Sequence, residues 1–343
     1  MRILVTGHEG YIGAVMVPRL LAQGYEVVGF DTGFFDRCAF GDDSAVRRVE
    51  ALRADLRDVE VEQLQGFDAV IHLGALSNDP LGDINADLTY EINEAASIRL
   101  ARAAREAGVR RFLFSSSCST YGASDSDDFL DESAQFNPVT PYGRSKVKVE
   151  EELCGLANDD FSPVYLRNAT AYGVSPRLRV DIVLNNLVAW GHTTGEIVLM
   201  SDGTPWRPLV HVEDICRAFE ASLTAPIPAI HNEAFNIGRT SENYRIRELA
   251  EIVGETVPGC VVKLAEGAGP DTRTYRVSCK KAEERLPGFD PQWDARKGAA
   301  ELYEAYKERD MTAERFQGPS YKRLATIQDL LGDGRLGENL RWA

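Results

Sequence analysis

Apolar residues in the first half of the chain follow two alternating patterns. Short continuous apolar runs, such as residues 3–5 and 112–114, are typical of strands buried on both faces of a parallel sheet. Between these runs, apolar residues recur at helical spacing. The alternation predicts an α/β fold with a doubly wound parallel sheet. We expect strands at residues 2–6, 26–30, 69–75 and 111–114, and helices at residues 14–23, 83–107 and 146–156.

The second half of the chain predicts a smaller C-terminal α/β lobe. We expect a first domain at residues 1–166 and a lobe formed mainly by residues 167–309, with the possibility that the chain crosses back to the first domain. The expected elements of this lobe are residues 231–238, 246–253, 260–264 and a helix at 295–307.

Residues 310–343 form a tail whose role the sequence leaves open. Its apolar residues have the spacing of a short amphipathic helix, which would pack on the body of the protein or on a second subunit. A partly disordered end is the alternative, because apolar content falls here. The residues of this pattern are Leu324, Ile327, Leu330 and Leu331.

Composition excludes several classes of protein. A net charge of −15 argues against a general nucleic-acid binder, which would carry a basic patch, although it leaves room for a local anion site. The six cysteines show no Cys-x-x-Cys pair or zinc-ligand spacing, and no apolar run approaches the roughly 18 residues that span a bilayer. We therefore expect a reduced cytoplasmic protein without a metal site or membrane contact.

Three glycines lie between the first predicted strand and the first predicted helix. Gly7, Gly10 and Gly13 leave the backbone N–H groups and the helix N-terminus open to a pyrophosphate, which a Cβ would obstruct. The spacing differs from the commoner G-x-G-x-x-G, and a purely structural turn is the alternative.

Two acids follow at strand ends. Asp31, about 20 residues after the glycines, is placed to accept hydrogen bonds from the adenosine ribose and to repel a 2′-phosphate, which favours NAD over NADP; a loop cap is the alternative. Asp55 would bind the adenine amine or cap the following helix, and the sequence does not separate these roles. Asn93, on the predicted helix 83–107, is compatible with a solvent-facing, a core or a binding role.

The third pattern is a tyrosine with a lysine four residues later. On a helix, Tyr142 and Lys146 share one face, and a nearby ammonium lowers the pKa of a phenol toward working pH, so that it can exchange a proton with a substrate. Such a pair also occurs on ordinary solvated helices. Residues 115–122, a run rich in hydroxyls, follow a predicted strand, and ligands of open α/β sheets bind at such strand ends.

In combination and order, these patterns resemble the extended short-chain dehydrogenase/reductase family, especially its nucleotide-sugar epimerases and dehydratases. The resemblance covers roughly residues 1–309 and implies a Rossmann-type sheet with a smaller substrate-binding lobe. The matching motifs are residues 6–13, 115–122, 141–146, 166–173, 206–214 and 269–273.

The resemblance also implies roles for individual residues. Tyr142 would be the general acid/base, Lys146 would tune it and hold the nicotinamide ribose, and Ser117 would be the catalytic serine. NAD would contact Gly7, Gly10, Tyr11, Ile12, Gly13, Asp31, Asp55, Leu56, Leu73, Gly74, Ala75, Asn93, Ser115, Tyr142 and Lys146. The substrate would contact Ser77, Ser117, Cys118, Ser119, Tyr142, Thr170, Asn186, Arg207 and Arg273, with the two arginines on its diphosphate or, alternatively, in surface ion pairs.

The chain departs from the family pattern at three places. Cys118 and Ser119 stand where the dehydratases carry an Asp-Glu pair, which disfavours loss of water. Thr170 stands where epimerases usually have Asn, and Pro208-Leu209 where they usually have Asp-Phe, so the sugar and phosphate pocket differs. Cys118 is either a functional thiol or a small packing residue.

Together these observations predict an NAD-dependent 4-epimerase acting on a nucleotide-diphosphate sugar. The first alternative is a dehydrogenase or 4-ketoreductase with net redox turnover, because it would share the same catalytic residues. A more remote alternative is a non-catalytic NAD-binding regulator, which would have no need of Ser117, Tyr142 and Lys146 together. Family likeness further implies a homodimer.

Overall fold

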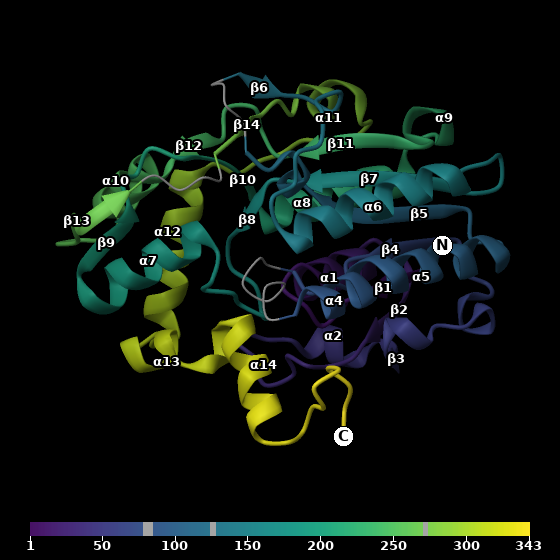
Figure 1. Cartoon of the computed structure of the whole chain (residues 1–343), viewed down its shortest axis with the longest axis horizontal. Coiled ribbons are helices and arrows are strands. Elements are labelled where there is room, and N and C mark those ends of the chain that lie inside the picture. Colours follow the sequence, from purple (N-terminus) through teal and green to yellow (C-terminus); the bar gives the residue numbers. More distant parts are fainter. Residues whose placement is uncertain (78–84, 124–127, 270–273) are drawn as a thin grey trace.

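The centre of the computed structural model is a seven-stranded, fully parallel sheet (Figure 1). The structure describes residues 1–77, 85–123, 128–269 and 274–343. The strand order is β11-β7-β5-β4-β1-β2-β3. From β1 the chain adds β2 and β3 on one side, and then adds β4 and the later strands on the other side, as in a doubly wound Rossmann-type fold. The strands are β1 (Arg2–Thr6), β2 (Glu26–Asp31), β3 (Glu50–Arg53), β4 (Ala69–His72), β5 (Arg111–Ser117), β7 (Ser162–Asn168) and β11 (Glu233–Ile237).

Helices cover both faces of this sheet, and alternate residues of each strand point to opposite faces. On β1, Ile3 and Val5 pack with the helices of one face, whereas Leu4 packs with those of the other. The first face carries α1 (Gly13–Ala22), α2 (Ser44–Arg48) and α8 (Val212–Thr224); the second carries α5 (Ala96–Glu106) and α6 (Pro141–Leu156). Apolar strands buried on both sides explain the continuous apolar runs in the sequence.

A smaller lobe lies beside the carboxyl ends of the sheet strands (Figure 1). It contains three small sheets, β12-β10-β8, β13-β9 and β14-β6, and its helices share one apolar cluster. The strands are β6 (Phe129–Leu130), β8 (Thr170–Tyr172), β9 (Glu196–Ser201), β10 (Trp206–His211), β12 (Asn243–Arg245), β13 (Val261–Gly269) and β14 (Arg276–Val277). The helices are α7 (Val183–Thr194), α10 (Ile246–Thr256) and α12 (Ala295–Glu308). The short helices α9 (Ile227–Ile230) and α11 (Lys280–Arg285) pack against β11 of the large sheet.

Two expected elements differ from the structure. The segment 231–238, which the sequence places in the smaller lobe, contains β11, and this strand pairs in parallel with β7 at the edge of the large sheet. The expected helix 83–107 is instead α4 (Ala86–Thr89), a π-helical segment (Tyr90–Ala95) and α5. Each difference arises from tertiary contacts, since a free sheet edge accepts β11, and a π-turn rotates Asn93 inward.

The C-terminal tail packs on the body of the protein. Its helices are α13 (Ala313–Gln317) and α14 (Arg323–Gly332). The indole Nε1 of Trp342 donates to the Thr32 carbonyl at 2.7 Å. An apolar cluster joins the tail to the first domain through Phe34, Leu76, Ile327, Leu330, Leu336 and Leu340. Of the two positions expected for the amphipathic helix, the structure shows the one on the body.

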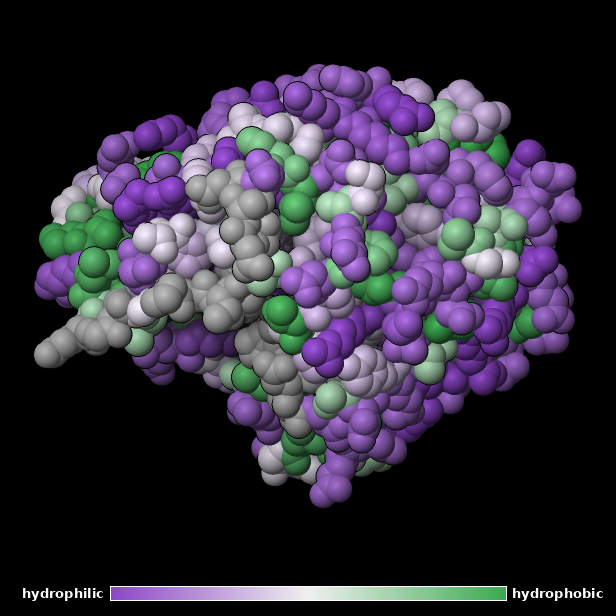
Figure 2. Space-filling view, turned by 45° about the horizontal axis from the view of Figure 1, so that its top comes forward, coloured by the Kyte–Doolittle hydropathy of each residue, from purple (hydrophilic) through white to green (hydrophobic). Residues whose placement is uncertain are grey.

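The surface is mainly hydrophilic, with apolar residues over the lobe end that carries β9 and β13 (Figure 2). Among the described residues, all six cysteines are free. The helices in the described ranges include none that is long and apolar enough to cross a membrane.

Candidate active site

One cavity of about 910 Å³ lies where the carboxyl ends of the large sheet meet the smaller lobe. Its size is in the range of cofactor and ligand sites. Most of the residues expected to bind cofactor or substrate line it. These are Gly7, Gly10, Tyr11, Ile12, Gly13, Asp31, Asp55, Leu56, Leu73, Gly74, Ala75, Ser77, Ser115, Ser117, Ser119, Tyr142, Lys146, Thr170, Asn186 and Arg207.

Tyr142 and Lys146 lie on the first turns of α6. The hydroxyl of Thr140 caps this helix by accepting a hydrogen bond from Gly143 N at 3.1 Å. The Lys146 Nζ lies 5.6 Å from the centroid of the Tyr142 ring and donates to the Ser115 carbonyl at 2.7 Å. The expected proximity of phenol and ammonium is therefore present.

The Lys146 side chain is buried, and this burial lowers its pKa to about 7, although the charge of Glu150 acts in the opposite direction. Glu150 lies one turn further along α6, where it forms a buried ion pair with Arg167 at 2.7 Å. Below that pH the Lys146 side chain is mainly an ammonium, and a nearby positive charge favours the phenolate form of a tyrosine.

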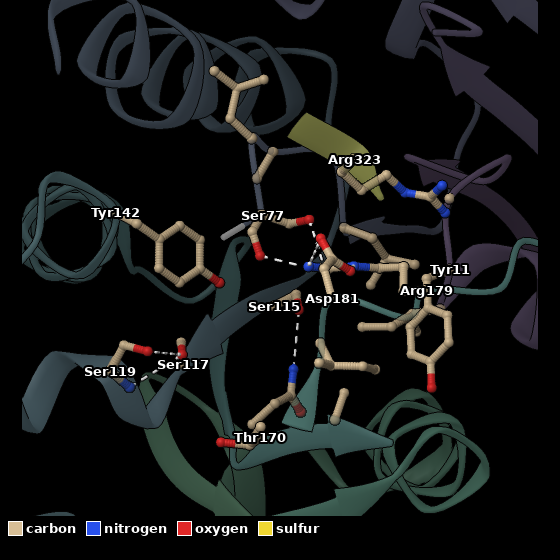
Figure 3. Close-up of a pocket in the computed structure, with 18 of the residues that line it drawn as sticks. Tyr11, Ser77, Ser115, Ser117, Ser119, Tyr142, Thr170, Arg179, Asp181 and Arg323 are labelled. Carbon is tan, nitrogen blue, oxygen red and sulfur yellow. Dashed lines mark hydrogen bonds and ion pairs between the residues drawn. The ribbon is translucent and has the colours of Figure 1, made fainter. Parts of the chain in front are cut away.

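Ser117 and Ser119 are among the serines of the hydroxyl-rich run that line the same cavity. Ser117, the last residue of β5, donates to Ser119 Oγ at 3.0 Å and accepts from Ser119 N at 3.1 Å. Figure 3 shows the Tyr142 hydroxyl directed into the pocket on the side where these two serines lie. The arrangement brings together a proton-exchanging phenol, an ammonium and hydroxyls that can hold a substrate oxygen.

Cys118, expected to contact the substrate, is not among the residues that line the cavity. Its side chain is 1% exposed, lies outside the lining of the cavity, and its Sγ donates to the Arg167 carbonyl at 3.1 Å. Burial raises the pKa of its thiol, so the reactive thiolate is disfavoured. Of the two alternatives for Cys118, the structure shows the packing residue.

The glycine loop fits the pyrophosphate of a dinucleotide. Gly7 has a φ of +70°, and a Cβ at Gly13 would lie 2.4 Å from the Gly7 carbonyl oxygen, so the loop cannot close on α1 with larger residues. Among the described residues, none accepts a hydrogen bond from the backbone N–H of Tyr11 or Ile12. These donors, at the N-terminus of a ten-residue helix, are available to an anion.

The two expected adenosine contacts also have structural roles. Asp31 accepts from Glu9 N at 3.1 Å and from Gly33 N at 2.9 Å, and so joins the glycine loop to the end of β2. Asp55 accepts from Arg57 N and forms an ion pair with the Arg57 guanidinium at 2.6 Å, which caps a 3₁₀ turn. Both carboxylates still line the cavity.

Asn93, expected to contact the cofactor, lies outside the cavity lining. The side chain is 1% exposed. Its Oδ1 accepts from Leu76 N at 2.7 Å, and its Nδ2 donates to the Leu76 carbonyl at 2.9 Å. Asn93 thus holds the segment that follows β4, and any effect on the cofactor passes through that backbone.

The expected substrate contacts come from several strands and helices around the cavity. Thr170 begins β8, and Asn186 on α7 donates to the Val180 carbonyl at 2.8 Å. Arg207 on β10 donates to the Trp206 carbonyl at 2.8 Å. Arg273 lies outside the described residues.

The cavity residues that the sequence did not identify include Asn168, Arg179, Asp181 and Arg323. Asn168, at the end of β7, donates to Ser115 Oγ at 3.0 Å, and its Oδ1 is buried without a partner among the described residues. Arg179 pairs with Asp181 at 2.9 Å and also donates to Ser77 Oγ at 3.2 Å. The charges at positions 177, 179 and 181 in an otherwise apolar segment were an available signal, whereas nothing local marked Arg323 in the tail.

Comparison with known proteins agrees with this geometry. Residues 3–238 match the NAD dependent epimerase/dehydratase family. A UDP-glucose 4-epimerase from Mycolicibacterium smegmatis is 30% identical over 324 residues, which cover 90% of this chain and 99% of the relative.

Solved structures show the same architecture. MoeE5 in complex with UDP-glucuronic acid and NAD has a TM-score of 0.77 and 27% identity, covering 90% of this chain and 99% of the other. The dTDP-glucose 4,6-dehydratase DesIV from Streptomyces venezuelae has a TM-score of 0.76 and 26% identity, covering 92% of this chain and all of the other. The matches therefore include both epimerases and dehydratases.

Proposed function

The chain belongs to the NAD dependent epimerase/dehydratase family, and we propose that within it the protein is a nucleotide-sugar 4-epimerase. The observation that carries this proposal is the convergence of Ser117, Tyr142 and Lys146 on one cavity whose glycine loop fits a dinucleotide. UDP-hexoses are the first substrates to test, because several relatives are UDP-glucose 4-epimerases.

In the proposed reaction, the side chains of the cavity move protons and hold the sugar. Tyr142, as phenolate beside the Lys146 ammonium, takes the proton of the C4 hydroxyl, and Ser117 donates a hydrogen bond to the same oxygen. Bound NAD would supply the hydride acceptor for C4 and, as NADH, the hydride donor to the opposite face, while the Tyr142 hydroxyl would return the proton to the C4 oxygen. Between these steps the sugar must rotate, so its diphosphate must be anchored while the hexose stays loosely held.

The same cavity disfavours dehydration. Loss of water needs an acid and a base beside the serine, and positions 118 and 119 supply a buried thiol and a hydroxyl instead. Ser119 is already hydrogen-bonded to Ser117, so it supports the oxygen-binding group rather than replacing a carboxylate.

The variant Tyr142→Phe tests the role of the phenol. It should lower kcat by about 100- to 10,000-fold, because proton transfer at C4 loses its acid/base, while bound NAD is retained. The measurement is C4 inversion of UDP-glucose followed by NMR, with cofactor content determined on the denatured protein. Tyr303→Phe, on α12 and outside the cavity, is the matched control. Wild-type activity of Tyr142→Phe would exclude the proposed acid/base.

Family likeness also supports a homodimer, and light scattering of the purified protein tests it. A mass twice that of the 37.9 kDa chain is expected, and a monomer at all concentrations would exclude it.

A further inference from the structure

The C-terminal tail contributes a buried arginine to the cavity. Arg323, the first residue of α14, is 2% exposed and lines the cavity near Arg179 and Asp181 (Figure 3). Its guanidinium carbon lies 4.3 Å from the centroid of the Phe35 ring, and its Nη2 donates to the Arg177 carbonyl at 2.8 Å. Its Nη1 is buried and has no hydrogen-bond partner within the described part of the chain.

The charges around Arg323 are not balanced by the described residues. Arg177 pairs with Asp43 at 2.5 Å and Arg179 pairs with Asp181 at 2.9 Å, so each of these carboxylates already has a cation. Burial is the main cause that lowers the pKa of Arg323 to about 10; repulsion from Arg179 and Arg177 acts in the same direction, and the charges of Cys38 and Asp181 act against it. A buried cation without an anion is costly, and a bound anion would offset that cost.

A chain of short contacts connects this arginine to the glycine loop. The Tyr11 hydroxyl donates to the Gly173 carbonyl at 2.8 Å, and the Ser175 hydroxyl donates to the Tyr11 carbonyl at 2.8 Å. The Ser175 Oγ then accepts from Arg177 N at 3.1 Å, and the Arg177 carbonyl accepts from Arg323. These hydrogen bonds link the cation from the tail, through Ser175 and Arg177, to the glycine loop whose backbone donors fit a diphosphate.

We propose that Arg323 is a ligand of the cofactor diphosphate, so that the C-terminal tail completes the NAD site. A diphosphate supplies the missing negative charge, and its oxygens accept charge-assisted hydrogen bonds from a guanidinium. The family match ends at residue 238, so Arg323 lies outside it. This inference rests on the NAD dependence of the family and not on the epimerase reaction.

The test compares two arginine-to-methionine variants within the tail. Arg323→Met keeps an unbranched side chain over Phe35 but removes the charge. Arg335→Met is the matched control, because Arg335 also lies over an aromatic ring, 5.4 Å from the Trp342 centroid, but does not line the cavity. Titration calorimetry on cofactor-free protein then measures affinity for NAD, ADP, UDP and adenosine.

Arg323→Met should lower the affinity for NAD and ADP by about 10- to 100-fold and leave the affinity for UDP and adenosine unchanged. The control should bind all four ligands as the wild type does. Equal losses of affinity for adenosine and ADP would mean that Arg323 only supports the fold. A loss of affinity confined to UDP would mean that Arg323 binds the sugar nucleotide. Either result overturns the proposal, and so does unchanged NAD affinity.

Arg323→Lys keeps the proposal testable if the methionine variant does not fold. A lysine retains the charge without the planar fork, so ADP affinity should fall by about 10-fold or less and adenosine affinity should stay the same. A parallel loss for adenosine would again indicate a purely structural role. None of these measurements depends on turnover. Their results can therefore be interpreted even if the epimerase proposal fails.

Discussion

Lys146 combines a proposed catalytic role with a cost in stability. Its ammonium group is buried against Phe114 and Tyr142, and the Ser115 carbonyl is its hydrogen-bond acceptor at 2.7 Å. The negative charge of Glu150 offsets only part of the desolvation, so the pKa of Lys146 falls to about 7. Functional sites often retain such residues at the expense of folding free energy.

Replacing Lys146 by methionine should therefore stabilise the cofactor-free protein in a pH-dependent way. Between pH 7 and about 10 the unfolded chain holds the Lys146 proton and the folded chain does not, so wild-type stability rises with pH. Lys146→Met should raise the free energy of unfolding by about 1 to 3 kcal/mol at or below pH 7, and this increase should shrink toward pH 10. Urea unfolding at several pH values measures it.

The control for this prediction is Lys148→Met. Lys148 is exposed on the same helix and pairs with Glu151 at 2.7 Å, so its removal should change stability by less than about 1 kcal/mol. A gain for Lys146→Met that stays constant from pH 6 to pH 10 would show that burial of the ammonium is not its origin.

The residues that the sequence identified are those with fixed spacing. Tyr142 and Lys146 share a helix face, and the glycines stand between a strand and a helix, so local geometry alone placed them. Asn168 and Arg323 reach the same cavity through tertiary packing, from a strand end and from the tail. No local pattern encodes such an approach, and only the folded chain reveals it.

At the level of elements, the large sheet was predictable because its strands are apolar on both faces. The edge strand β11 was placed in the wrong lobe, since its sequence does not show that it returns to pair with β7. The π-helical segment before α5 was also missed. It turns Asn93 toward Leu76, and this hydrogen-bonded contact compensates for the irregular helix.

The tail helix α14 is predicted to be a structural part of the first domain. Ile327 is fully buried in the cluster that contains Phe34 and Leu76, so Ile327→Ala should lower the free energy of unfolding by about 2 to 5 kcal/mol. Leu331→Ala, on the same helix but only partly buried, should cost distinctly less. Denaturant unfolding of both variants tests this, and equal small losses would mean that the tail packs loosely.

At the scale of the whole molecule, a strongly acidic protein gathers positive charge at its cavity. The chain has a net charge of −15, yet the cavity between the two lobes is lined by four basic residues (Lys146, Arg179, Arg207 and Arg323) and three acidic ones (Asp31, Asp55 and Asp181). Local positive charge in a concave site attracts anionic ligands regardless of the net charge. This arrangement suits a dinucleotide and a sugar nucleotide that both carry a diphosphate.

The central claim is that the oxidation at C4 is transient. The most direct measurement incubates the purified protein, without added cofactor, with UDP-glucose deuterated at C4, and follows the sugar by NMR and NADH by absorbance. The account predicts UDP-galactose that retains the deuterium at C4, with no net change in NADH. Turnover that requires added NAD and accumulates reduced cofactor with a keto sugar would contradict it and indicate a dehydrogenase.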